Sequence, residues 1–391
     1  MKHACSLVFY VFLIMGCCSA TAQTDYEAWK HQHLQRYKSF SQDYQNRYRE
    51  FKKRLAPKWG EEPELSSNSS FVSYSKDLNQ KTVLDFDKQE IRVEILEGNG
   101  SVTTAQDIKQ TILQFTSQSV SAAAAEDPLL SDVNVSDTRS LAVAMVPDQS
   151  FAAAIEQSVV EVQETKVNPA PEHPGSTVSA KTGTAAEKRV KQYTVKLGNK
   201  NLLQHRAAAY KEYVSKASKE YKLDSSLLLA IMQVESSFNP MAQSPIPAFG
   251  LMQIVPESAG KDVNTRVFKI KKAPSPEQLF APAHNIKFGS AYLNILETNY
   301  LSSVTDPLSR HYCVIAAYNT GAGNVASVFH PKREKAVAEA IKVINTLTPK
   351  QVYEKLITEL PYDETRKYLR KVTEAIPNYA TELSDAARTS K

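Results

Sequence analysis

From about Leu202 to the end of this 391-residue chain, the spacing of apolar residues becomes helical and stays so, and this change limits what the chain can fold into. After it, segments that repeat apolar residues at three- and four-residue steps follow one another, separated by Pro, Gly or Asn, as helices are. Before it, several segments alternate apolar and polar residues, as strands do. We therefore expect an α+β fold, with an N-terminal α/β accessory domain over residues 23–200 and a C-terminal, mostly α domain over residues 201–391.

A long helix is expected to open the N-terminal domain. Aromatic residues and one histidine recur every three or four residues from Tyr26 to Phe51, on one face of a helix that should end before Pro57. We favour the interpretation that this face packs on its own domain. The alternative is a basic amphipathic helix that lies on anionic lipid or on a cell-wall polymer.

Strands are expected to follow this helix. "KTVLDF" and "EIRVEIL" alternate around a polar turn at residues 87–89 and predict an antiparallel hairpin. "FVSYSK" is a candidate third strand, a helix should cover residues 104–118, and "VKQYTVKL" is a candidate to return to the same sheet. Residues 165–188 contain three prolines, few apolar side chains and no periodicity, so we expect a disordered insertion there.

The first 22 residues have the pattern of an export signal, with a basic start, an apolar run from Leu7 to Met15 and then small residues. The run is short for a membrane span. "LIMGC" would make Cys17 the diacylated first residue of a lipoprotein, whereas "ATA" before Gln23 fits ordinary signal-peptidase cleavage. The residues alone leave both endings open.

Charge and cysteine content exclude several classes of function. The net charge of +5 matches the excess of nine basic over four acidic residues within residues 24–58, so nucleic-acid binding is not indicated. Cys313 is the one cysteine outside the leader, which excludes an internal disulfide framework, and we expect a small buried apolar side chain. His31 and His33 would point in different directions from a helix, so they predict no metal pair.

The stretch "LLLAIMQVESSFNP", residues 227–240, carries the strongest candidate for chemistry. Leu228 and Ile231 recur at helical steps, and Asp224 stands where an N-cap belongs. Glu235 follows Ile231 by four residues, so its side chain should lie on or beside the buried face. Apolar surroundings should raise its pKa, as a general acid at neutral pH requires, although a purely structural acid fits the same pattern.

Three later segments, "FGLMQIVPESAG", "AAYNTGAGNV" and "DETRKYLRKV", place polar groups at helix ends, which is typical of a small-molecule or sugar cleft. With "ESSFNP" before them, and in this order, these motifs resemble the soluble lytic transglycosylase family, which shares the goose-type lysozyme fold. The resemblance covers roughly residues 211–371. "DYEAWK" and "FVSYSKDLNQKTVLDFDKQEIRVEIL" also resemble the N-terminal domain of the membrane-bound lytic murein transglycosylase C group.

The resemblance implies that Glu235 is the single catalytic acid/base of a peptidoglycan lytic transglycosylase. It would protonate the β-1,4 bond between N-acetylmuramic acid and N-acetylglucosamine and then take the proton of the muramyl C6 hydroxyl, which closes a 1,6-anhydro ring. Substrate contacts are implied for Ser244, Gln253, Tyr318, Asn319 and Tyr368. No metal or organic cofactor is implied.

Two alternatives share the same motifs. One is a hydrolytic goose-type lysozyme, in which Glu257 or Asp262 could serve as the base, and the other is a non-catalytic peptidoglycan-binding protein. The resemblance favours Cys17 as the lipidated N-terminus, and Cys18 in place of an aspartate favours the outer membrane, facing the periplasm. A soluble periplasmic form after cleavage before Gln23 is the alternative. Expected partners are peptidoglycan glycan strands, outer-membrane lipid and other cell-wall enzymes, and no nucleic acid.

Overall fold

The computed structural model describes residues 42–98, 103–146, 151–169, 187–197 and 201–380. The signal segment, Cys17 and most of the expected N-terminal helix lie outside these ranges. The chain forms two compact units, Met1–Arg47 and Tyr48–Lys391, and of the first only residues 42–47 are described, as part of a helix. All contacts discussed below lie within the second unit.

The aromatic helix covers residues 42–59 of the described chain, and its second half packs on the sheet that follows. Phe51 and Leu55 are buried in one cluster with Leu96 and Val190 of that sheet. For these residues the interpretation that we favoured, packing on the helix's own domain, is therefore correct.

The predicted end of this helix before Pro57 is wrong, because the helix continues to residue 59. Trp59 is buried, its indole N–H donates to the main-chain carbonyl of Leu78 at 2.9 Å, and its ring meets Tyr74 edge to face. The proline removes one backbone donor, and the burial of a tryptophan offsets that loss.

The sheet has five antiparallel strands in the order β1-β2-β3-β5-β4. The strands are β1 (Ser70–Tyr74), β2 (Gln80–Asp85), β3 (Glu90–Leu96), β4 (Val160–Val167) and β5 (Lys188–Lys196). The predicted hairpin, the third strand and the returning strand are all confirmed. The insertion is corrected at its ends, since residues 165–167 belong to β4 and Lys188 to β5; residues 170–186 lie outside the described chain.

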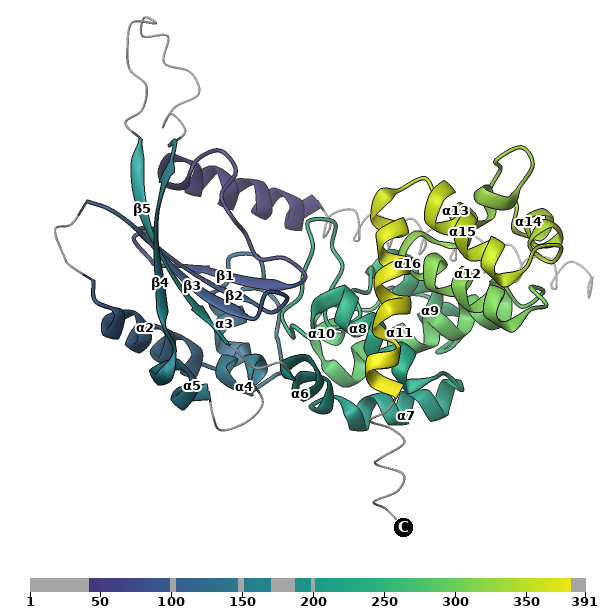
Figure 1. The fold of residues 1–391 in the computed structure, drawn as a ribbon, viewed down its shortest axis with the longest axis horizontal. Helices are drawn as coiled ribbons and strands as arrows, with labels where there is room; N and C mark the ends of the chain where they lie inside the picture. Colours follow the sequence, from purple (N-terminus) through teal and green to yellow (C-terminus); the bar gives the residue numbers. More distant parts are fainter. Residues whose placement is uncertain (1–41, 99–102, 147–150, 170–186, 198–200, 381–391) are drawn as a thin grey trace, which may run out of the picture. The chain divides into compact units, whose positions relative to one another are not determined.

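One face of the sheet is covered by short helices, as Figure 1 shows. They are α2 (Ala105–Ser117), α3 (Val120–Glu126), α4 (Leu141–Met145) and α5 (Phe151–Gln157). α2 confirms the helix expected at residues 104–118, and Thr104 caps it by accepting the N–H of Asp107 at 3.2 Å. The apolar face of β3, with Ile91 and Val93 fully buried, turns to this core.

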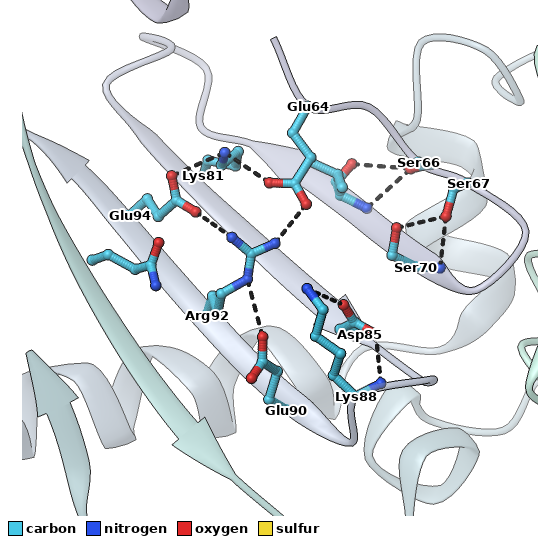
Figure 2. Close-up of polar contacts among 12 residues, drawn as sticks. Glu64, Ser66, Ser67, Ser70, Lys81, Asp85, Lys88, Glu90, Arg92 and Glu94 are labelled. Atoms are coloured by element: carbon cyan, nitrogen blue, oxygen red, sulfur yellow. Dashed lines mark hydrogen bonds and ion pairs between the residues drawn. The ribbon is translucent and has the colours of Figure 1, made fainter. Parts of the chain in front are cut away.

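The other face of the sheet carries charges. The strand register places Lys81 opposite Glu94, so these side chains share a face with Arg92, two residues before Glu94. Figure 2 shows that Glu64, from the segment before β1, lies between the two basic groups, 2.9 Å from Lys81 and 2.5 Å from Arg92. Glu90 adds a third carboxylate, 3.5 Å from the Arg92 guanidinium.

The chain after residue 201 is helical, as predicted, and the α+β fold class is confirmed. Its helices are α6 (Leu202–Ala208), α7 (Lys211–Tyr221), α8 (Ser225–Ser236), α9 (Lys261–Arg266), α10 (Pro276–Phe280), α11 (Pro282–Ile295), α12 (Pro307–Thr320), α13 (Ala322–Phe329), α14 (Val337–Ile344), α15 (Pro349–Glu359) and α16 (Asp363–Ala375), with π-helical turns η1 (Pro256–Gly260) and η2 (Leu296–Tyr300). Within the described ranges, no helix has the length and apolar character needed to cross a membrane.

Candidate active site

Helix α8 places Glu235 at its C-terminal end. The helix starts as predicted, with the Asp224 carboxylate accepting the N–H of Ser226 at 2.8 Å. It ends at Ser236, and the capping residue Ser237 adopts a left-handed conformation and donates its N–H to the carbonyl of Gln233 at 2.9 Å. Glu235 is thus the next-to-last helical residue and is held by a rigid, buried helix.

A cavity of about 570 Å³ opens beside Glu235. Five of the six site residues predicted from the sequence line it together: Glu235, Ser244, Gln253, Tyr318 and Asn319. The sixth, Tyr368, is buried and does not line the cavity. The volume lies within the range of pockets that hold small ligands or a few sugar units.

The pKa of Glu235 is raised to about 8. Burial is the largest cause, because removing the carboxyl group from water disfavours its charged form. Tyr368 acts against burial, since its hydroxyl stabilises the carboxylate, and the negative charge of Glu364 raises the pKa further. Glu235 is therefore largely protonated at neutral pH, as the sequence argument expected.

Ser244 and Gln253 come from the loop that follows α8. The Ser244 hydroxyl donates to the carbonyl of Ile246, and the Gln253 side-chain amide donates to the carbonyl of Gly250 at 3.0 Å. Gly250 has a φ of +73°, and a Cβ there would lie 2.3 Å from the carbonyl oxygen of Leu279. A glycine is therefore required at this turn, which sets Gln253 against the cavity.

Tyr318 and Asn319 lie near the end of α12 and line the same cavity. The Tyr318 hydroxyl donates to the carbonyl of Met252 at 2.8 Å, and Asn319 accepts the Thr365 hydroxyl at 2.7 Å through its Oδ1 atom. These bonds tie α12 to the "GLMQ" turn on one side and to α16 on the other. The loop and two helices thereby hold one cavity wall in a fixed arrangement.

Several residues that line the cavity were missed in the sequence, among them Glu364 and Asn68. Glu364 lies in the first turn of α16, four residues before Tyr368 and hence on the same helix face, a spacing that could have revealed it. Asn68 reaches the cavity from the segment before β1, and no local pattern marks it. Glu257 and Asp262, considered as bases, do not line the cavity and pair with Lys261 and Arg266.

Residues 212–341 match the family model of the transglycosylase SLT domain. The membrane-bound lytic murein transglycosylase C of Pectobacterium atrosepticum is 48% identical over 182 residues, which are 46% of this chain and 49% of that protein. The protein of the same name from Yersinia pestis is 47% identical over 182 residues, with the same two coverages. The chain thus spans about half the length of the curated relatives it matches.

Two solved structures are also similar. The 70 kDa soluble lytic transglycosylase from Escherichia coli is 26% identical, with a TM-score of 0.34, over 44% of this chain and 24% of that one. A lytic transglycosylase from Pseudomonas aeruginosa, solved as an inactive mutant, is 28% identical with a TM-score of 0.34 over 45% and 24%. The resemblance stated from the motifs is confirmed: the chain carries a match to the transglycosylase SLT domain and is similar to curated membrane-bound lytic murein transglycosylases C.

Proposed function

We propose that the protein is a peptidoglycan lytic transglycosylase that cleaves the β-1,4 bond between N-acetylmuramic acid and N-acetylglucosamine without water. The observation that carries this proposal is the pKa of about 8 at Glu235, the carboxyl group beside a cavity of about 570 Å³. The SLT domain match and the names of the curated relatives support the same reaction class.

In the first step the Glu235 carboxyl gives its proton to the bridging oxygen. The bond from the muramyl C1 atom to that oxygen breaks, and the N-acetylglucosamine side leaves as an alcohol. Burial keeps Glu235 protonated near neutral pH. It can therefore act as a general acid without a second carboxylate to supply its proton.

In the second step the Glu235 carboxylate removes the proton of the muramyl C6 hydroxyl, and that oxygen bonds to C1. The 1,6-anhydro ring closes, and Glu235 is again protonated. The attacking oxygen belongs to the same sugar, so its effective concentration exceeds that of any solvent nucleophile.

The remaining predicted site residues are proposed as substrate contacts. Ser244 and Gln253 would hold the muramyl N-acetyl group from the loop side, and Tyr318 and Asn319 would bound the sugar on the other. Four of these side chains line the cavity beside Glu235. Tyr368 would act through Glu235, whose carboxylate its hydroxyl stabilises.

Product analysis tests the reaction. Purified sacculi digested by the full chain should release muramyl ends that lack a reducing group and are lighter by one water molecule than hydrolysed ends. Glu235→Gln should lower the rate by about 10²–10⁴-fold. Glu257→Gln is the matched control, because this acid lies outside the cavity and pairs with Lys261. Reducing ends alone would identify a hydrolytic lysozyme instead, and equal rates for wild type and Glu235→Gln would overturn an enzymatic role.

We further propose that Cys17 is the lipidated N-terminus and anchors the protein to the outer membrane, facing the periplasm. The "LIMGC" sequence supports this, as does the name of the curated relatives, which describes them as membrane-bound. Mass analysis of the mature protein should find a diacylated Cys17, and Cys17→Ala should release the protein from membranes. A mature N-terminus at unmodified Gln23 would contradict this anchor. Other cell-wall enzymes as partners stay a prediction.

A further inference from the structure

The main-chain carbonyl of Glu235 accepts a hydrogen bond from a residue that is distant in the sequence. As the next-to-last residue of α8, Glu235 has one of the terminal carbonyls that find no partner within the helix. The side-chain amide of Asn68, 167 residues earlier, donates to this oxygen at 2.8 Å. The carbonyl of Asn68 in turn accepts the side-chain amide of Asn239 at 3.2 Å. A reciprocal pair of hydrogen bonds therefore joins the end of α8 to the segment before β1.

We call that segment, residues 64–69, the strap, and its first residue is fixed to the sheet. Figure 2 shows the Glu64 carboxylate between Lys81 and Arg92 on the charged face of the sheet. Burial alone would raise the pKa of Glu64, but the two cations together lower it. Glu64 is therefore ionised at neutral pH and anchors the strap to two neighbouring strands.

The strap is also a closed turn around Asn68. The Ser67 hydroxyl accepts the N–H groups of Ser69 at 3.2 Å and Ser70 at 3.1 Å, and Figure 2 shows its contact with Ser70. The Ser66 hydroxyl accepts the N–H of Val72 at 3.0 Å. Because these bonds fix the backbone of the strap, presenting the Asn68 amide costs no further backbone entropy.

The chain just after Glu235 needs outside support. Ser237 and Phe238 both have positive φ, 49° and 63°, which is costly for a residue with a side chain and especially for an aromatic one. The Arg206 guanidinium donates to the Ser237 carbonyl at 2.9 Å, and the Ser237 hydroxyl donates to Asp87 at 3.2 Å. A strained turn of this kind keeps its shape only while its neighbours hold it.

We propose that Asn68 is a positioning residue for Glu235. Its side-chain amide, presented by the strap, binds the main-chain carbonyl of Glu235, and the sheet region thereby fixes the position and orientation of the Glu235 carboxyl group. The inference rests on the proposed function of Glu235 as the acid. Asn68 touches the main chain of Glu235 and needs no contact with the reacting atoms, so its effect passes through the position of α8.

The side chain of Glu235 is sensitive to such a shift. Three groups interact electrostatically with the Glu235 carboxyl: Tyr318 on α12, and Glu364 and Tyr368 on α16. All three belong to the helical region, while the carbonyl of Glu235 is held from the sheet side. Loss of the Asn68 bond would let the end of α8 move relative to these groups and would admit water to the carboxyl.

The first experiment compares Asn68→Leu, which keeps the volume and removes the donor, with Asn79→Leu as a matched control. Asn79 lies in the turn between β1 and β2, and its amide donates to Asp77 at 2.8 Å, outside the cavity. On peptidoglycan glycan strands, Asn68→Leu should lower kcat about 10- to 100-fold with KM changed less than about twofold. Asn79→Leu should match wild type in both constants.

The second experiment tests the strap. Glu64→Gln weakens the anchor and touches neither Glu235 nor the cavity, so it should lower kcat by a smaller factor than Asn68→Leu. Added to Asn68→Leu, it should lower kcat no further, because the strap acts through Asn68. Independent effects that multiply in the double variant would overturn this route.

A third measurement needs no turnover. In ¹³C NMR titrations of the full chain, the Glu235 carboxyl should titrate nearer to its ordinary pKa in Asn68→Leu than in wild type, and unchanged in Asn79→Leu. If Asn68→Leu had the same kcat, the same KM and the same Glu235 titration as wild type, the proposal would be overturned. If the wild-type protein released no anhydro-muramyl product, the proposed function would be overturned instead. The titration would still decide whether Asn68 positions Glu235.

Discussion

Glu364 and Tyr368 lie one turn apart on α16 and act on the pKa of Glu235 in opposite directions. The Glu364 carboxylate raises this pKa, and the Tyr368 hydroxyl lowers it by stabilising the anion. Two residues on one face of α16 therefore help to set the pH at which Glu235 loses its proton.

Substitution of these two residues should move the alkaline limb of the pH–rate profile in opposite directions. Glu364→Gln removes a negative charge and should lower the pKa of Glu235 from about 8, so activity should fall at a lower pH. Tyr368→Phe should raise that pKa and extend activity to higher pH. The measurement is kcat on glycan strands from pH 5 to 10, and limbs that move together or not at all would contradict this assignment.

The raised pKa of Glu235 should also make stability depend on pH. The folded value of about 8 lies above the ordinary value of 4.5, so the native state binds the extra proton between these two pH values. This contribution is complete below pH 4.5 and is lost as pH rises through 8. At ~1.4 kcal/mol per pH unit the upper limit is about 5 kcal/mol, and solvent in the open cavity reduces it.

Glu235→Gln stays neutral at every pH, so it should approach wild type in stability near pH 4 and exceed it near pH 9. Thermal unfolding of the two proteins across this range measures the difference. A constant gap in Tm between pH 4 and pH 9 would show that Glu235 titrates like an exposed glutamate.

Sequence periodicity was sufficient for several of the longer elements that bury apolar side chains. The hairpin of β2 and β3 and helix α8 follow directly from it, and so does the burial of Glu235 beside Ile231. β4 was missed because it is an edge strand whose side chains are largely exposed, so no apolar alternation marks it. The short helices after residue 119 were missed for want of a long periodic pattern.

The site residues also divide into those that a local sequence pattern predicts and those that it does not. Ser244, Gln253, Tyr318 and Asn319 stand in motifs near the ends of elements, and the structure brings them to one cavity. Asn68 could not be found from the sequence, because its partner is 167 residues away and the bond goes to a main-chain carbonyl that any residue would supply. Tertiary contacts of this kind leave no local pattern.

Gly250→Ala should disrupt the turn that holds Gln253. A Cβ at this position would lie 2.3 Å from the Leu279 carbonyl oxygen and 2.5 Å from the Asn285 amide, and φ is +73°. We expect a loss of about 2–4 kcal/mol in the free energy of unfolding and a KM raised severalfold. Gly98→Ala is the control, since a Cβ there meets nothing within 4 Å and should leave both quantities unchanged. Equal stability of the two variants in urea denaturation would contradict the close approach at Gly250.

Arg206→Met should be among the most destabilising substitutions in the described chain. The buried guanidinium donates to three main-chain carbonyls, those of Met145, Phe86 and Ser237, and so joins α4, the β2–β3 turn and the end of α8. Burial lowers the pKa of Arg206 to about 10, which still leaves it charged at neutral pH.

Methionine fills a similar volume but leaves the three carbonyls without a donor, each at a cost of about 1–3 kcal/mol, partly offset because the buried charge is gone. The net loss should be about 3–5 kcal/mol in urea denaturation at pH 7. Arg266→Met removes the same charge from a partly exposed pair with Asp262, so it should cost no more than about 1 kcal/mol. If the two variants lost equal stability, the three carbonyls would have found other donors, and Arg206 would contribute only as one more positive charge.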